Sequence, residues 1–232
     1  MIIKGFQRTS LIDYPNNICS TVFLANCNFR CGFCYNKDLV LNSPELKEFS
    51  QEEILAELGR RKKYIDGVCI TGGEPLLNPD LPEFIRKIRA LDFLVKVDTN
   101  GSFPKMLDEL TGDKLVDYIA MDVKSSLEKY PKVTGVPVDP QKIRESAKII
   151  MRSGVPYEFR TTVVPTLVEE EDVRKIGEWL AGGKQYYLQQ FRPITSLDPV
   201  FSKKVPYSKE TILWFQKVAQ EYFEKVGVRG IS

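Results

Sequence analysis

The 232-residue sequence contains no histidine. Histidine is the commonest general acid or base near neutral pH and the commonest zinc ligand in proteins. Its absence removes both options from any mechanism that the chain could use.

The sequence also lacks a charge excess and a long apolar run. Lys and Arg number 33 against 31 Asp and Glu, which gives a formal net charge of +2 and indicates no general attraction to nucleic acid or to a membrane. No apolar stretch approaches the roughly 20 residues of a membrane span, and no secretory leader is visible at residues 1–15. We therefore expect a cytoplasmic protein that binds neither nucleic acid nor membrane.

Cysteine is scarce, with five residues in all. An odd number makes a poor disulfide framework and favours a reducing compartment. Cys19 and Cys69 lie within strand patterns and are expected to be small buried residues. The other three, Cys27, Cys31 and Cys34, have the close spacing C-x3-C-x2-C.

Six β-rich runs alternate with helical patterns along the chain. They cover residues 18–25, 67–71, 93–99, 116–123, 157–164 and 185–191. The alternation predicts parallel βα units with right-handed crossovers, so we expect an α/β fold with an open parallel sheet, a partial (β/α)6 TIM-like barrel. The length suits a single domain over 1–232, in which 1–17 form an N-terminal extension that adds a strand or a flap.

Helix boundaries follow from capping signals. Ser50 and Glu53 form a capping box, and Asp80 is expected to cap the next helix. The three prolines of 124–140 predict a long loop, and 208–227 predicts a closing helix.

The three clustered cysteines directly follow the first predicted strand, where parallel βα folds build active sites. Structural zinc takes four ligands, and Cys19 and Cys69 are awkward candidates for the fourth. A 4Fe-4S cluster held by three cysteines keeps one iron open for a substrate or cofactor, which suits a catalyst. A catalytic cluster, a zinc site and unligated core thiols all remain open at this point.

A second motif follows the next strand, "TGGEPLLNP", with Gly72, Gly73 and Glu74. Two glycines let the backbone approach a ligand closely, and exposed amides and carbonyls can bind its polar groups. Alone this is an ordinary turn, but together with the cysteine motif it favours a cofactor site.

The cysteine motif at 27–34 and GGEP at 72–75 resemble the radical S-adenosylmethionine (SAM) superfamily. The resemblance implies that the three cysteines hold a 4Fe-4S cluster and that SAM chelates the fourth iron. It also places Phe33 beside the adenine and the GGEP segment at the methionyl amino group. In this family, an electron from the cluster cleaves SAM to methionine and a 5′-deoxyadenosyl radical that abstracts hydrogen.

Three more segments end strands with polar residues. They supply Asp98 and Asn100, Asp122 and Lys124, and Arg160. Each has an ordinary reading as an Asx turn, a solvated lysine or a surface ion pair, but their shared position at strand ends favours a site. They resemble segments of the glycyl-radical enzyme activating enzymes, which implies that the aspartates organise SAM and can hold a monovalent cation and that Lys124 meets the SAM carboxylate.

Residues 9–36 and 187–193 most resemble the activating proteins of anaerobic ribonucleoside-triphosphate reductase. Many activating enzymes carry a histidine where this chain has Tyr35, and Gln190 or Arg192 is expected to replace another. Since two cysteines cannot build a second cluster, the resemblance implies reduced flavodoxin or ferredoxin as electron donor.

The leading hypothesis is therefore an activating enzyme that forms a glycyl radical on a partner, expected to be anaerobic ribonucleoside-triphosphate reductase. A short open barrel needs no substrate lid of its own. The alternatives are a pyruvate formate-lyase-type activating enzyme, a radical SAM enzyme with a small substrate (7-carboxy-7-deazaguanine synthase-like), and a non-catalytic iron–sulfur or zinc protein.

Overall fold

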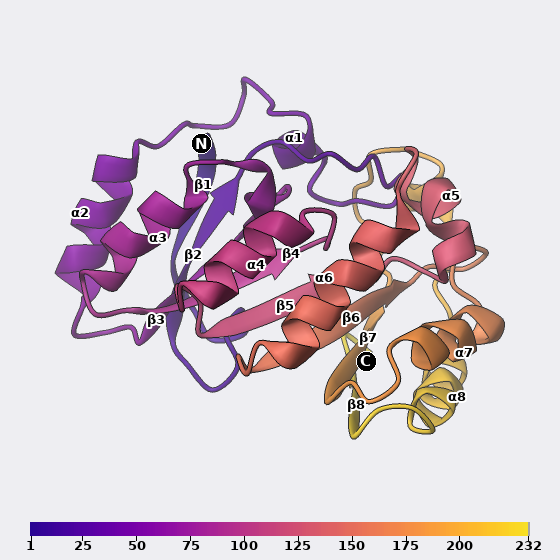
Figure 1. Ribbon diagram of the computed structural model, residues 1–232. Coiled ribbons are helices and arrows are strands. Elements are labelled where there is room, and N and C mark those ends of the chain that lie inside the picture. Colours follow the sequence, from indigo (N-terminus) through magenta and orange to yellow (C-terminus); the bar gives the residue numbers. More distant parts are fainter. Residues whose placement is uncertain (232) are drawn as a thin grey trace.

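A computed structural model describes residues 1–231 (Figure 1). Its eight strands form one sheet in chain order. The strands are β1 (Ile3–Ser10), β2 (Cys19–Leu24), β3 (Gly67–Gly72), β4 (Leu94–Thr99), β5 (Tyr118–Asp122), β6 (Tyr157–Val163), β7 (Gln185–Gln190) and β8 (Lys225–Arg229). β1 pairs with β2 antiparallel, and every other neighbouring pair is parallel. Within 1–231, β8 does not pair with β1, so the sheet is an open arc.

Helices connect the parallel strands and cover the outer face of the sheet (Figure 1). They are α1 (Lys37–Val40), α2 (Gln51–Arg61), α3 (Leu81–Arg89), α4 (Pro104–Gly112), α5 (Tyr130–Thr134), α6 (Pro140–Arg152), α7 (Glu170–Trp179) and α8 (Lys209–Ala219), with 3-10 turns η1 (Pro75–Leu77), η2 (Leu127–Lys129) and η3 (Phe201–Lys203). At α2 the predicted capping box is confirmed, because Ser50 Oγ accepts from Glu53 N at 3.0 Å and Glu53 Oε2 accepts from Ser50 N at 2.7 Å. In 1–231, no helix has both the length and the apolar character to cross a membrane.

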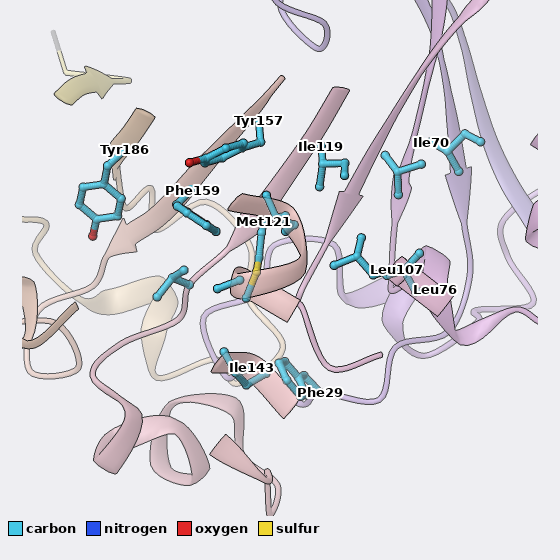
Figure 2. Packing of buried hydrophobic residues seen from close by; sticks show 14 of the residues in the cluster. Phe29, Ile70, Leu76, Leu107, Ile119, Met121, Ile143, Tyr157, Phe159 and Tyr186 are labelled. Atoms are coloured by element: carbon cyan, nitrogen blue, oxygen red, sulfur yellow. The ribbon is translucent and has the colours of Figure 1, made fainter. Parts of the chain in front are cut away.

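The two faces of the sheet differ in chemistry. Because side chains alternate along a strand, Ile70, Ile119 and Phe159 all project toward the helices and build the hydrophobic core there (Figure 2). The alternate positions, such as Lys96 and Glu158, form the inner face of the arc. They are buried and charged. The main core therefore lies on the helix side of the sheet, and the inner face combines charged side chains with a small cluster of Tyr14, Cys19, Cys69 and Tyr118.

The six predicted strands and the open parallel sheet are confirmed, with two additions. Residues 3–10 of the N-terminal extension form β1, one of the two options expected. The predicted closing helix over 208–227 is wrong at its end, because α8 stops at Ala219 and β8 follows. The partly buried Val226 and Val228 of β8 pack against the core from the helix side.

Two further predictions are corrected. Residues 124–140 are not one long loop, because η2 and α5 lie within them and the fully buried Tyr130 anchors them to the core. Asp80 precedes α3 but makes no side-chain capping bond, and its carboxylate instead accepts from Gln51 Nε2 at 3.4 Å.

Candidate active site

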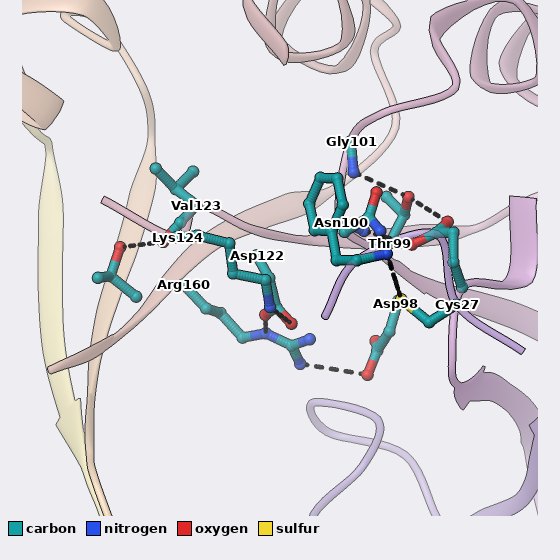
Figure 3. Close-up of polar contacts among 12 residues, drawn as sticks. Cys27, Asp98, Thr99, Asn100, Gly101, Asp122, Val123, Lys124 and Arg160 are labelled. Atoms are coloured by element: carbon teal, nitrogen blue, oxygen red, sulfur yellow. Dashed lines mark hydrogen bonds and ion pairs between the residues drawn. The ribbon is translucent and has the colours of Figure 1, made fainter. Parts of the chain in front are cut away.

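The predicted site residues meet at one edge of the sheet, around the carboxyl ends of β2 to β6. The cysteine loop (residues 25–36) follows β2, and the GGEP turn (72–75) begins at the end of β3. The polar residues of β4, β5 and β6 lie beside the loop, as Figure 3 shows for Cys27, Asn100 and Asp122. The edge at which parallel folds place active sites is therefore the edge at which this chain gathers its candidate residues.

The three cysteines of the loop are free thiols. Burial raises the pKa of Cys27 to about 11 and that of Cys31 to about 12, and the nearby charge of Lys124 opposes both shifts. Among residues 1–231, no three His, Cys, Asp or Glu side chains converge on a position suited to one metal ion. Cysteines that bind a four-iron cluster attach to separate irons. Three free thiols on one loop with Lys124 beside them fit such a cluster, and its binding there stays a prediction.

The glycine pair of the GGEP turn packs against the cysteine loop. Gly72 has a φ of +117°, and a Cβ atom on Gly73 would lie 1.9 Å from the Asn26 carbonyl oxygen. Glu74 N donates to the same carbonyl at 2.8 Å. The close approach that the two glycines allow is thus to the chain's own cysteine loop.

The Glu74 side chain is fully buried and connects the GGEP turn to the turn that follows β4. Its carboxylate accepts from Thr99 Oγ1 at 2.7 Å, from Asn100 N at 2.7 Å and from Leu76 N at 3.1 Å. Burial raises the pKa of Glu74 to about 7, although these hydrogen bonds oppose the shift. Contact between Glu74, Gly72 or Gly73 and a cofactor stays a prediction.

Asn100 connects the end of β4 to the cysteine loop (Figure 3). Its side-chain oxygen accepts from Ser102 N at 3.0 Å, which is the expected Asx turn. Its amide nitrogen also donates to Asn28 Oδ1 at 2.9 Å and approaches Cys27 Sγ at 3.8 Å. One side chain therefore serves both the turn and the site.

Arg160 joins the two predicted aspartates (Figure 3). It donates to Asp122 at 2.8 Å and to Asp98 at 3.3 Å, and Lys124 bonds Asp122 at 3.1 Å. Arg160 and Lys124 hold the pKa of Asp122 below its usual range, and Arg160 and Lys96 do the same for Asp98, although burial opposes both shifts. The Asp122 carboxylate raises the pKa of Lys124 against the effect of burial.

Sequence reasoning missed three charged members of this network. Lys96 is fully buried and bonds both Asp98 and the Cys69 sulfur. Arg229 makes two 2.7 Å bonds to the buried Glu158. The alternation of side chains along a strand could have revealed two of them. It puts Lys96 on the same face as Asp98, and Glu158 on the same face as Arg160. The linked network holds four cations and three carboxylates.

The expected monovalent cation does not fit this arrangement. Both Asp98 oxygens already accept from Lys96, Arg160 or Thr71. Both Asp122 oxygens accept from Arg160 or Lys124. A further cation would add positive charge where the chain's own cations already satisfy the carboxylates.

Phe33 is buried in the cysteine loop and contacts a segment that the sequence analysis did not single out. Its ring meets Phe201 edge to face, with centroids 6.2 Å apart. Phe201 lies in the long connection between β7 and α8. The sequence analysis expected no lid over the open barrel. Part of the connection between β7 and α8 nevertheless packs against the cysteine loop.

The residues at the positions of the missing histidines lie in two places. Burial and the nearby charge of Asp122 raise the pKa of Tyr35, and Arg160 and Lys124 oppose the shift. Tyr35 is 68% exposed. Gln190 and Arg192 line an open hollow of about 420 Å³ beyond β7 and β8, together with Tyr207 and Lys209. Tyr35 therefore lies close to the charged network, and Gln190 and Arg192 lie in the separate hollow.

Comparison with protein families identifies the chain at superfamily level. Residues 21–180 match the model of the Radical SAM superfamily. A protein of Methanocaldococcus jannaschii named as a glycyl-radical enzyme activating enzyme is 35% identical over 100% of this chain and 97% of its own length. The pyruvate formate-lyase-activating enzyme of Staphylococcus epidermidis is 30% identical over 68% of this chain and 67% of its own.

Solved structures agree on the fold. Streptococcus suis SuiB, crystallised with its precursor peptide SuiA, superposes with a TM-score of 0.71 over 90% of this chain and 48% of that chain. SuiB crystallised with S-adenosylmethionine gives 0.69 over 90% of this chain and 52% of that one. At 15% and 14% identity these likenesses support the fold alone.

Proposed function

The chain belongs to the radical SAM superfamily, among the glycyl-radical enzyme activating enzymes, and on this premise we propose that it forms a glycyl radical on anaerobic ribonucleoside-triphosphate reductase. It is an enzyme whose cofactors are a 4Fe-4S cluster and SAM. The whole-length relationship to a named activating enzyme is the observation that carries the proposal.

Cys27, Cys31 and Cys34 are the proposed cluster ligands. When bound, the cluster and SAM supply one-electron cleavage of a carbon–sulfur bond and hence hydrogen-atom abstraction. The chain contributes free thiols on a loop whose Phe29, Cys31 and Phe33 are buried. Lys124 beside the thiols favours their deprotonated form, which is the form that binds iron.

The charged network suits an anionic cofactor group. With four cations to three carboxylates, it holds one positive charge in excess. Lys124 ends the network nearest the cysteines. We assign it to the SAM carboxylate, with Arg160 fixing Asp98 and Asp122 around it. Phe33, Asn100 and the GGEP turn complete the proposed cofactor contacts.

The choice of partner rests on residues 9–36 and 187–193, which resemble the activating proteins of the reductase. A pyruvate formate-lyase-type enzyme is the second candidate partner, supported by the Staphylococcus relative. An external flavodoxin or ferredoxin supplies the electron in either case, since the remaining Cys19 and Cys69 cannot hold a second cluster.

The test is anaerobic mixing of the reconstituted protein, SAM and a one-electron reductant with each candidate enzyme. We expect the doublet of a glycyl radical in the electron paramagnetic resonance spectrum of the reductase. Deuterium placed on its glycine should appear in 5′-deoxyadenosine. A doublet on the formate-lyase enzyme alone would move the assignment to that partner. No doublet, with multiple turnovers of a purine-like small molecule, would overturn the proposal.

A further inference from the structure

The connection between β7 and α8 spans residues 191–208 and contains only the short turn η3. Connections longer than about 12–15 residues without regular structure are uncommon and usually functional. We call residues 193–204 of this connection the strap. The strap crosses from β7 to the cysteine loop after β2, two segments far apart in the sequence.

The strap binds the main chain of the cysteine loop. Asp198 N donates to the Gly32 carbonyl at 2.9 Å, and Leu197 N donates to the Cys34 carbonyl at 3.0 Å. The strap thereby holds the loop on either side of Phe33. Within the strap, the hydroxyl groups of Ser196 and Ser202 form a hydrogen bond at 2.7 Å, which joins its two halves.

Phe201 is the side chain through which the strap packs on this loop. Its ring lies so close to Gly32 that a Cβ atom there would be 2.6 Å away. The same ring meets the edge of Phe33. Gly32 is therefore small because Phe201 occupies the space beside it.

The other side of the cysteine loop is held independently. Arg30 N donates to the Thr134 carbonyl at 2.7 Å, and a Cβ on Gly135 would lie 2.5 Å from the Arg30 carbonyl. The span from Arg30 to Cys34, which carries the second and third cysteines, is thus fixed by α5 at one end and by the strap at the other.

We propose that Phe201 is a positioning residue that pins Gly32 and Phe33 so that Cys31 and Cys34 keep the spacing the cluster requires. This inference rests on the assignment of the cluster to the three cysteines. Without the ring, the carbonyl contacts of the strap remain, but the Gly32–Phe33 segment gains room to move. Iron should then leave the site more easily.

The test compares iron retention in reconstituted wild-type protein and Phe201→Ala. After addition of excess ferrous chelator, we expect the visible absorbance of the cluster to decay roughly tenfold faster in the variant, as suits loss of an aromatic contact. Phe201→Leu should give an intermediate rate. Val200→Ala is the matched control, since Val200 is in the strap but 63% exposed, and it should match wild type.

A double-mutant cycle tests the contact from the other side. Gly32→Ala should also speed iron loss, because its Cβ would clash with the ring. Gly32→Ala combined with Phe201→Ala should be no faster than either single change, because the clash is gone. Equal rates in all variants, or additive effects, would overturn the inference. A wild-type protein that binds no iron would instead overturn the cluster assignment.

Discussion

At the residue scale, the inner face depends on mutual neutralisation. A buried charge without a partner costs several kcal/mol, so each member of the network needs its neighbours. Lys96 has 2% of its side chain exposed. Its burial is tolerated because Asp98 and the Cys69 sulfur accept hydrogen bonds from its ammonium group. Arg160 is tolerated because Asp98 and Asp122 flank it.

Replacing Lys124 should weaken SAM binding. Lys124→Ala removes a charge-assisted contact, worth about 1.5–3 kcal/mol, from the proposed carboxylate position. The measurement is a SAM titration of the reduced cluster followed by electron paramagnetic resonance. Lys132→Ala, an exposed lysine on α5, is the control. Equal affinity in both variants would remove Lys124 from the cofactor site.

Glu74 predicts a pH dependence of the iron-free protein. Since its folded pKa is about 7 against an ordinary 4.5, the folded state binds more protons than the unfolded state between these values. Glu74 therefore lowers stability as pH rises from 4.5 to 7, by about 3 kcal/mol in total, and adds no further change above pH 7.

Glu74→Gln lacks this titration, so its free energy of unfolding should rise relative to wild type over the same pH range. Urea unfolding of both proteins at several pH values measures the difference. A difference that stays constant from pH 4.5 to 7 would contradict the raised pKa.

Site residues that belong to short motifs could be predicted from the sequence. Ion pairs between residues far apart in the chain could not. Cys27 and Lys124 belong to local patterns at strand ends. Glu158 and Arg229 are 71 positions apart, and each alone is an ordinary charged strand residue. Only the folded sheet, in which β7 lies between β6 and β8, brings their side chains together on one face.

At the element scale, Gly72 and Gly73 determine how closely the GGEP turn packs against β2 and the start of the cysteine loop. Gly73→Ala should displace this loop, because the new Cβ would meet the Asn26 carbonyl at 1.9 Å. We expect loss of iron binding and a lower melting temperature.

Gly59→Ala is the matched control for this change. Gly59 lies in α2, and a Cβ there would meet nothing within 4 Å. It should raise stability by about 1 kcal/mol through helix propensity. Thermal unfolding with iron analysis separates the two cases, and a Gly73→Ala protein with normal iron content would refute the packing argument.

Strand β8 should depend on one ion pair. Arg229→Met leaves the buried Glu158 without its two short bonds, which costs about 3–5 kcal/mol. Hydrogen exchange of residues 225–229 should quicken. Lys225→Met, an exposed residue of the same strand, should leave exchange unchanged. Unaltered exchange in the Arg229 variant would mean that β8 is held by other contacts.

Regular elements were predictable and irregular ones were not, for a physical reason. Alternation and capping are properties of neighbouring residues, so β2 to β7 and the start of α2 could be read from the sequence. The strap has no period, because its shape is set by contacts such as Phe201 on Gly32. The same holds for α5, whose burial of Tyr130 depends on the whole fold.

At the scale of the whole molecule, we expect one cluster per chain. Anaerobic reconstitution should yield about four irons and four sulfides. Cys31→Ala should lose the cluster, whereas Cys69→Ala should keep it, because Cys69 lies in β3 and contacts Lys96 instead. Zinc at one per chain without iron would contradict the cluster.

The one-sided core has a consequence for evolution. Residues such as Ile70 and Phe159 build the core on the helix side, so inner-face positions of β7 that lie outside the charged network can change composition with little penalty to the rest of the molecule. New substrates could be acquired there by exchange of a few side chains, while the cofactor end stayed constant. Directed evolution of this chain should therefore begin at Gln189, which is only partly buried and lies on the inner face.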